Sequence, residues 1–312
     1  MKKLLRYWLA GSAEICEYPT VTVDNAIVEH VFLRTRDKIL HISETHGVFC
    51  LRPIVFGIWL ADEDARAVLQ SDSPEINFCN PGSPSRIHDV VARGKLKYVD
   101  QIVCDGGSLL LFRLEACRIY HLNFIKTRAL YLRYYKKPTL DFAGFKFLVT
   151  AYSYPRRVRI VSFRDEGFYN IFPMDLLGEI PTAHKQIFGL RHTNITLQKI
   201  IHAGKIAIAE VPFRYKDIIY ELGKHHGSNP PVLASLPFGT IETANWGFYL
   251  PEWAESYKEI EITRSIDLGS HMLLWGDIVY EHRLKESSGN LYHIHFLEWL
   301  CQRNKGKFYP LV

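Results

Sequence analysis

The feature that most limits the fold is a series of short segments in which apolar and polar residues alternate, separated by turn residues. The clearest are KIAIAEV (205–211) and segment 258–284, which reads as two long strands joined at Asp267, Leu268 and Gly269. Alternation with a period of two predicts strands with one buried face, and a short join containing glycine predicts a hairpin. Strands outnumber helices, so we expect antiparallel pairing and no doubly wound parallel sheet.

Residues 1–145 mix strand-like and helix-like patterns. Segments 48–60 and 108–124 are apolar and rich in β-branched or aromatic residues, as buried strands are. Segments 61–71 and 83–94 are predicted to be helices, because residues typical of helix starts precede or open each of them. The sequence therefore predicts a strand-rich α+β domain over 1–145, and it gives no indication of what this domain does.

Residues 146–312 form the second predicted domain. Its strands are predicted at 158–163, 171–176, 185–190, 205–211, in the hairpin 258–284 and at 292–300, and its helices at 194–204 and 214–226. The fold class is therefore mainly β with α (α+β). Segments 87–99 and 197–211 share a helix, Gly-Lys, strand pattern, but this pattern is common, so we expect no internal duplication.

Composition narrows the class of partner. The chain has 312 residues, a net charge of +5 and Lys and Arg spread along its length, whereas nucleic-acid binding usually needs a basic patch. No segment approaches the ~20 apolar residues of a membrane span, and Arg6 interrupts the apolar run near the N-terminus. The six cysteines form no CxxC pair. We predict a cytoplasmic protein that binds neither nucleic acid nor membrane.

The turn LRHTN (190–194) precedes a predicted helix and is the first candidate site. The first N–H groups of a helix lack partners and carry a partial positive charge, so Arg191 with the hydroxyls of Thr193 and Thr196 would suit a phosphate. In the alternative, Asn194 or Thr193 only caps the helix and Arg191 is a surface charge.

Other motifs are weaker. His293 and His295 alternate on a predicted strand and share one face, as some metal ligands do. No third ligand follows from the spacing, so we expect no metal site. GxSxG, HExxH, P-loop and GxGxxG motifs are absent.

Three segments in order resemble the flavin reductase-like, FMN-binding split-barrel family. They are RIVSFRDEGFYNIFPMDLLGEI (159–180), FGLRHTNITLQKIIHAGKIAIAEV (188–211) and LPEWAESYKEIEITRSIDLGSHMLLWGDIV (250–279), the last with His271 followed five residues later by Gly276. The resemblance covers about residues 155–285 in the C-terminal half.

The resemblance implies a split β-barrel over residues 146–312, FMN as cofactor and a homodimer with the flavin at its interface. Arg191, Thr193 and Thr196 would hold the phosphate, His192 shares their turn, and His271 would lie near the flavin. The residues beside the isoalloxazine ring would be Asn170, Ile171, Phe172, Pro173, Met174 and Asp175.

The activity implied is an NAD(P)H-dependent flavin reductase or a related oxidoreductase, in which bound FMN transfers hydride and no catalytic side chain is assigned. The alternatives are a non-catalytic flavin-binding or scaffold protein and a split barrel without flavin. Pro173 supplies no N–H, and the insert 227–249 is long for a loop. The electron acceptor, the pathway and the choice between NADH and NADPH do not follow from the sequence.

Overall fold

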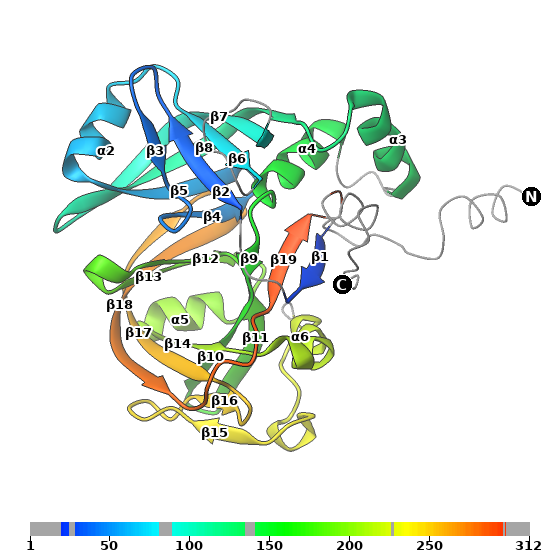
Figure 1. Cartoon of the computed structure of the whole chain (residues 1–312). Coiled ribbons are helices and arrows are strands. Elements are labelled where there is room, and N and C mark those ends of the chain that lie inside the picture. Colours follow the sequence, from blue (N-terminus) through cyan, green and yellow to red (C-terminus); the bar gives the residue numbers. More distant parts are fainter. Residues whose placement is uncertain are drawn as a thin grey trace, which may run out of the picture.

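The computed structural model describes residues 20–24, 29–80, 89–134, 141–225, 228–295 and 297 (Figure 1). Two seven-stranded sheets make up most of it, one above the other in this view, and a few helices pack around them. The predicted mainly β class with helices is therefore confirmed. None of the helices within the described residues is long and apolar enough to cross a bilayer.

The first sheet is built from the N-terminal part of the chain and is antiparallel throughout. Its strands are β2 (His30–Arg34), β3 (Ile39–His41), β4 (His46–Leu51), β5 (Ile54–Ala61), β6 (Glu75–Cys79), β7 (Val90–Cys104) and β8 (Gly107–Ile119). Their order across the sheet is β3-β2-β6-β7-β8-β5-β4. Helix α2 (Asp62–Leu69) lies between β5 and β6 in the chain and buries Ala65 and Val68.

The second sheet is also antiparallel. Its strands are β10 (Arg159–Asp165), β11 (Phe168–Met174), β12 (Leu177–Ile180), β13 (Lys185–Arg191), β14 (Lys205–Glu210), β17 (Ser256–Asp267) and β18 (His271–Arg283). Their order is β11-β10-β14-β17-β18-β13-β12. Helix α5 (Leu197–Ala203) lies between β13 and β14 and packs Leu197 and Ile200 against the inner face.

The two sheets repeat one strand order. If β2 to β8 are matched in turn with β10, β11, β12, β13, β14, β17 and β18, the two orders are identical, and α2 and α5 fall between the same pairs of strands. The sequence did not predict this repeat. The echo between 87–99 and 197–211 matches β7 with α5 and β14, which are not equivalent elements.

Each sheet must curl. In the second sheet the edge strands β11 and β12 are joined by only two residues, Asp175 and Leu176, so the two edges of the sheet lie close together. In the first sheet the edge strands β3 and β4 are joined by residues 42–45 in the same way. The chain thus has two halves, the first built on the sheet of β2 to β8 and the second on the sheet of β10 to β18. Each half is a curled sheet with a gap between its edges.

The segment 83–94 is not the predicted helix where the structure describes it. Residues 81–88 lie outside the described residues, and from Val90 the chain is strand β7, paired with β6 and β8. A Cβ at Gly94 would lie 2.4 Å from Cδ1 of Leu114, so this glycine allows close packing within the sheet and does not end a helix. Helix 61–71 and hairpin 258–284 are confirmed.

The remaining elements connect or cover the two sheets. A three-stranded sheet holds β1 (Thr20–Val23), β19 (Tyr292–His295) and β9 (Arg156–Arg157), and β15 (Thr240–Glu242) pairs with β16 (Tyr249–Pro251). The other helices are α3 (Phe124–Tyr134), α4 (Phe142–Ala151), α6 (Lys216–Gly223) and the 3₁₀ turns η2 (Pro181–Ala183), η3 (Phe213–Tyr215) and η4 (Leu233–Ser235). The predicted domain boundary at 145/146 falls inside α4.

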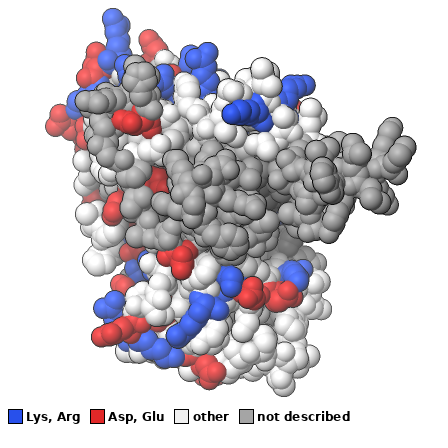
Figure 2. Space-filling model, turned by 45° about the vertical axis from the view of Figure 1, so that its right-hand side comes forward, with Lys and Arg blue, Asp and Glu red and all other residues white. Residues whose placement is uncertain are grey.

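The two halves share a buried core that contains apolar side chains from both sheets. Phe49 on β4 is at its centre, with its ring against Gly47 and Gly57 of the first sheet and Gly178 of the second. A Cβ at Gly189 would lie only 2.1 Å from the carbonyl oxygen of Phe49, so β4 lies directly against β13. On the face shown in Figure 2, basic and acidic side chains are interspersed among the described residues.

Candidate functional site

The main candidate is a cavity of about 330 Å³ beside the gap of the second sheet. Its walls come from three parts of that sheet: residues 172–176 at the end of β11, residues 189–191 at the end of β13, and His271 at the start of β18. The first half contributes Leu51 from β4. The cavity therefore lies where the two halves meet.

Six of the predicted site residues line this cavity: Phe172, Pro173, Met174, Asp175, Arg191 and His271. Arg191 and His271 face each other as the last pair of the β13–β18 ladder. Strand pairing thus brings together two residues that are far apart in the sequence, and the pairing of β12 with β13 brings the third predicted segment to the same place.

The other predicted residues lie elsewhere. Ile171 is buried in an apolar cluster with α6 and does not line the cavity. Asn170 is fully buried; its Nδ2 donates to Oγ1 of Thr196 at 2.6 Å, and its Oδ1 lies 2.9 Å from Nε2 of His225. His192 is at the surface, with Nε2 3.2 Å from Oδ1 of Asp267.

The structure does not bring the three predicted phosphate-binding residues, Arg191, Thr193 and Thr196, together in the cavity. Arg191 lines the cavity, Thr193 is exposed in the turn, and Thr196 is fully buried with its hydroxyl bonded to Asn170. The N–H of Thr196 donates to Oδ1 of Asn194 at 2.9 Å, so Asn194 closes the turn before α5. Of the turn LRHTN, Leu190, Arg191 and Asn194 line the cavity.

His271 is the most unusual polar group of the cavity. It is 2% exposed, its Nδ1 lies 2.8 Å from Oγ of Ser270, and its Nε2 has no protein hydrogen-bond partner among the described residues. Burial lowers the pKa of His271 to about 4, and the charge of Arg191 adds to this effect. His271 is therefore neutral near pH 7, and one buried ring nitrogen is left for a ligand.

Sequence reasoning missed a chain of hydrogen bonds beside the cavity. Oδ2 of Asp175 lies 2.9 Å from Nδ1 of His293, Nε2 of His293 lies 2.6 Å from the hydroxyl of Tyr220, and that hydroxyl lies 2.5 Å from Oγ1 of Thr22. Burial alone would raise the pKa of Asp175, but the hydrogen bond and charge of His293 and the charge of Arg156 hold it well below its usual range.

His293 and His295, which alternate on β19, contact different partners in the structure. His293 pairs with Asp175, whereas the Nε2 atoms of His295 and His121 are 3.0 Å apart. Among the described residues, no group of three or more His, Cys, Asp or Glu side chains is arranged to hold a metal ion. One residue of the sequence could have indicated the contact between β13 and β4. This residue is Gly189, because a glycine inside a strand marks a close approach of another segment.

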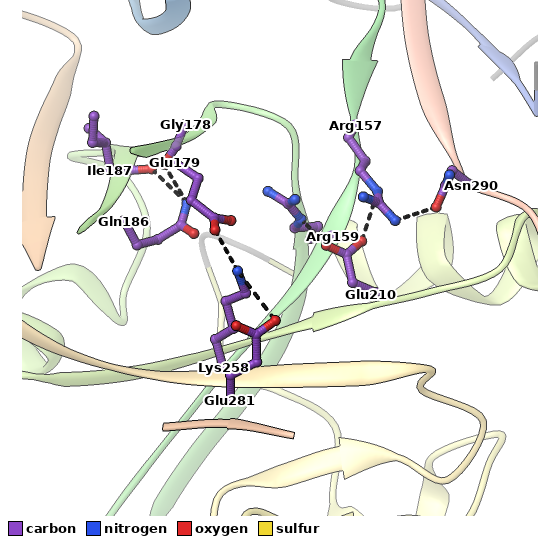
Figure 3. A network of polar contacts seen from close by, with 10 residues as sticks. All are labelled: Arg157, Arg159, Gly178, Glu179, Gln186, Ile187, Glu210, Lys258, Glu281 and Asn290. Atoms are coloured by element: carbon purple, nitrogen blue, oxygen red, sulfur yellow. Dashed lines mark hydrogen bonds and ion pairs between the residues drawn. The ribbon is translucent and has the colours of Figure 1, made fainter. Parts of the chain in front are cut away.

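A network of ion pairs, drawn in Figure 3, involves side chains of β9, β10, β12, β14 and β17. Nε of Arg157 and Nε of Arg159 lie 2.8 and 2.5 Å from the carboxylate oxygens of Glu210, and Nζ of Lys258 lies 2.6 Å from Oε1 of Glu179. Each of these cations already has a carboxylate partner. Arg159 and Glu210 link the neighbouring strands β10 and β14, whereas Lys258 and Glu179 link β17 with β12, which are not neighbours in the sheet. Because its cations are paired, the network offers little to an added anion.

Comparisons with known proteins give matches only among solved structures. No protein-family model matches the sequence, and no curated protein matches it. The FMN-binding protein from Thermus thermophilus with bound 1-cyclohex-2-enone has 20% sequence identity, a TM-score of 0.37, and coverage of 42% of this chain and 71% of its own.

Two other matches have similar values. The NADH:FAD oxidoreductase SgcE6 of Streptomyces globisporus has 14% identity, a TM-score of 0.40, and coverage of 44% of this chain and 81% of its own. BorF, the flavin reductase component of a bacterial two-component tryptophan halogenase, has 13% identity and a TM-score of 0.41. The match covers 45% of this chain and 88% of BorF. Part of this chain is thus similar to solved structures of FMN-binding proteins and flavin reductases, the kinds of protein that the sequence resemblance named.

Proposed function

We propose that this chain is an FMN-binding flavoprotein that takes hydride from NADH or NADPH, and that its flavin occupies the cavity between β11, β13 and β18. One observation carries the proposal: six residues that the sequence resemblance assigned to the flavin, drawn from three separate segments, line a single cavity. The curled second sheet, with its gap at Asp175 and Leu176, corresponds in this proposal to the split barrel.

The groups in the cavity fit the parts of FMN. Arg191 offers a guanidinium to a phosphate, and the buried Nε2 of His271 calls for a polar ligand atom. Phe172, Leu190 and Leu51 form apolar walls of the kind that a flat ring system needs. A volume of about 330 Å³ is at the lower end of the range for small-molecule sites, about 300–1,000 Å³.

Bound FMN would supply the redox chemistry, which is the transfer of hydride. The residues of the chain bind and orient it. Because β11 is an edge strand, the backbone groups on its outer side are available to a ligand, although Pro173 contributes no N–H. Arg191 would neutralise the phosphate, and Leu51 would keep water away from one side of the cavity.

The homodimer implied by the resemblance stays a prediction, as does the cytoplasmic location. One chain already brings a second half against the site, because Leu51 of the first half lines the cavity. Light scattering during a flavin titration would show whether binding depends on a second chain.

The test of the proposed function is an absorption spectrum of the purified protein, a titration with FMN, and assays of NADH and NADPH oxidation. Flavin bands or quenching of flavin fluorescence with saturation support the proposal. A protein that neither carries nor binds FMN overturns it. Flavin binding without oxidation of either nucleotide would select the alternative, a non-catalytic flavin-binding protein.

A further inference from the structure

The first half touches the site in a second place, at the turn between β17 and β18. The N–H of Ser270 donates to the carbonyl oxygen of Arg52 at 2.8 Å, and the N–H of Arg52 donates to Oγ of Ser270 at 3.0 Å. Gly269 has φ +114°, and a Cβ there would lie 2.7 Å from the oxygen of Arg52. The turn between β4 and β5 is therefore docked closely on the turn that begins strand β18.

Ser270 connects this docked turn with His271. Its Oγ lies 2.8 Å from Nδ1 of His271 and accepts the N–H of Arg52. Cys50 adds a third contact from the first half: its Sγ donates to the carbonyl oxygen of Leu268 at 3.3 Å and lies 3.5 Å from Oγ of Ser270. Two residues of β4 and its turn thus surround one hydroxyl.

The position of the hydroxyl proton follows from these contacts. A serine hydroxyl has one proton and two lone pairs, and the N–H of Arg52 occupies one lone pair. The proton can go to Nδ1 of His271 at 2.8 Å or to the sulfur of Cys50 at 3.5 Å. The imidazole nitrogen is the closer and stronger acceptor, since sulfur accepts weakly. A neutral imidazole that accepts at Nδ1 carries its own proton on Nε2.

We propose that the first half acts as a positioning module for the site: Arg52 and Cys50 hold Ser270, and Ser270 fixes His271 in the tautomer that presents an Nε2–H donor to the cavity. Ser270, Arg52 and Cys50 are positioning residues, and His271 is the residue that contacts the ligand. The partner of the donor is an acceptor oxygen with negative charge, because Arg191 is the ladder neighbour of His271. Only the identity of that ligand rests on the proposed function.

The experiment uses the full chain with nitrogen-15-labelled histidine, without flavin. Long-range proton–nitrogen correlation spectra distinguish the two neutral tautomers, and the signal of His271 is assigned by its loss in His271→Gln. We expect the Nε2–H form in the wild type. Ser270→Ala removes the hydroxyl donor and should shift His271 to the Nδ1–H form or to a mixture, while the exposed Ser265→Ala on β17 should change nothing.

A second variant tests the role of the first half. Gly269→Ala keeps both Ser270 and His271 but displaces Arg52, so the serine hydroxyl is no longer held in one orientation toward Nδ1 and a mixture of tautomers is expected. In FMN titrations, Ser270→Ala should weaken binding about three- to tenfold, the effect of one misdirected neutral hydrogen bond. Ser270→Thr, which restores a hydroxyl, should recover most of it.

The outcomes separate this inference from the proposed function. An Nδ1–H tautomer in the wild type overturns the inference, as does a tautomer that stays Nε2–H in both Ser270→Ala and Gly269→Ala. If the wild type binds no FMN, the proposed function fails, but the tautomer spectra still decide whether the first half positions His271.

Discussion

The two halves of this chain have the same strand order but differ at the end of one ladder. In the second half the last pair of β13 and β18 is Arg191 and His271; in the first half the matching pair of β5 and β8 is Ala61 and Gly107. A Cβ at Gly107 would lie 2.3 Å from the carbonyl oxygen of Leu60, so that position leaves no room for a side chain. The first half therefore has no counterpart of Arg191 or of His271 at this position.

The connections after these ladders differ as well. In the first half α2 begins at Asp62, directly after β5, whereas residues 192–196 separate β13 from α5 in the second half. That added turn carries Asn194, another residue of the cavity. The comparison teaches that one strand order can serve two purposes: the second half has the site, and the first half supplies a wall and a docked turn.

The largest effect is expected where β4 of the first half lies against the second. Gly189→Ala would place a Cβ 2.1 Å from the carbonyl oxygen of Phe49, and because that neighbour is backbone, strand β4 would have to move. We expect a loss of about 2–4 kcal/mol in the free energy of unfolding, as for other overpacked cores. Chemical denaturation measures this loss.

Gly239→Ala is the matched control for that variant. Its Cβ would also lie close to another atom, but that atom is the carboxylate of Glu252, which can swing away. We expect a change within about 0.5 kcal/mol. Equal losses in the two variants would contradict the close contact of the halves at Gly189.

The next effect concerns the polar pair that only the second half has. Arg191→Gln removes the guanidinium of the cavity and should weaken FMN binding at least about tenfold, since a hydrogen bond to a charged group contributes about 1.5–3 kcal/mol. Arg264→Gln, an exposed arginine on β17, makes the same change of charge away from the cavity. Similar affinities of these two variants, measured by fluorescence quenching, would remove Arg191 from the site.

Much of this difference between the two halves could not be predicted from local sequence patterns. Hairpin 258–284 was predictable because both strands alternate and a short turn joins them. The strand in segment 83–94 was not predictable from its helix-like pattern. From Val90 onward this segment pairs with β6 and β8, and that pairing overrides the local preference. For the site, the resemblance pointed to Arg191 and His271, which β-pairing brings together. No spacing rule predicts the contact of His293 with Asp175, which are 118 positions apart.

A smaller effect is expected in the pH dependence of stability, which can be compared for one buried histidine in each half. Burial lowers the pKa of both His46 and His271 to about 4, helped by the charges of Arg156 and Arg191 respectively. Their unfolded pKa is about 6.5, so the stability that depends on the neutral form is complete above that pH. It is lost as the pH falls from about 6.5 to about 4.

His46→Gln and His271→Gln should each flatten this acid loss, by about 1–2 kcal/mol between pH 6.5 and 4. The halves differ in what else changes: FMN affinity should fall in His271→Gln and stay constant in His46→Gln. Unfolding curves at several pH values and flavin titrations at pH 7 measure both. An equal fall of affinity in His46→Gln would mean that the first half shares the binding site more directly.

The smallest effect is expected when a positive charge is added to the first half at the position that matches Arg191. Ala61→Arg places an arginine at the position of the first half that matches Arg191. Ala61 is exposed and precedes Asp62, Glu63 and Asp64 in the first turn of α2, so the new guanidinium would pair with those carboxylates at little cost in stability. Gly107 still leaves no room for a histidine opposite it. The stoichiometry in an FMN titration should therefore remain one per chain, and a second bound flavin would show that the strand order alone, and not the pair at the end of the ladder, makes the site.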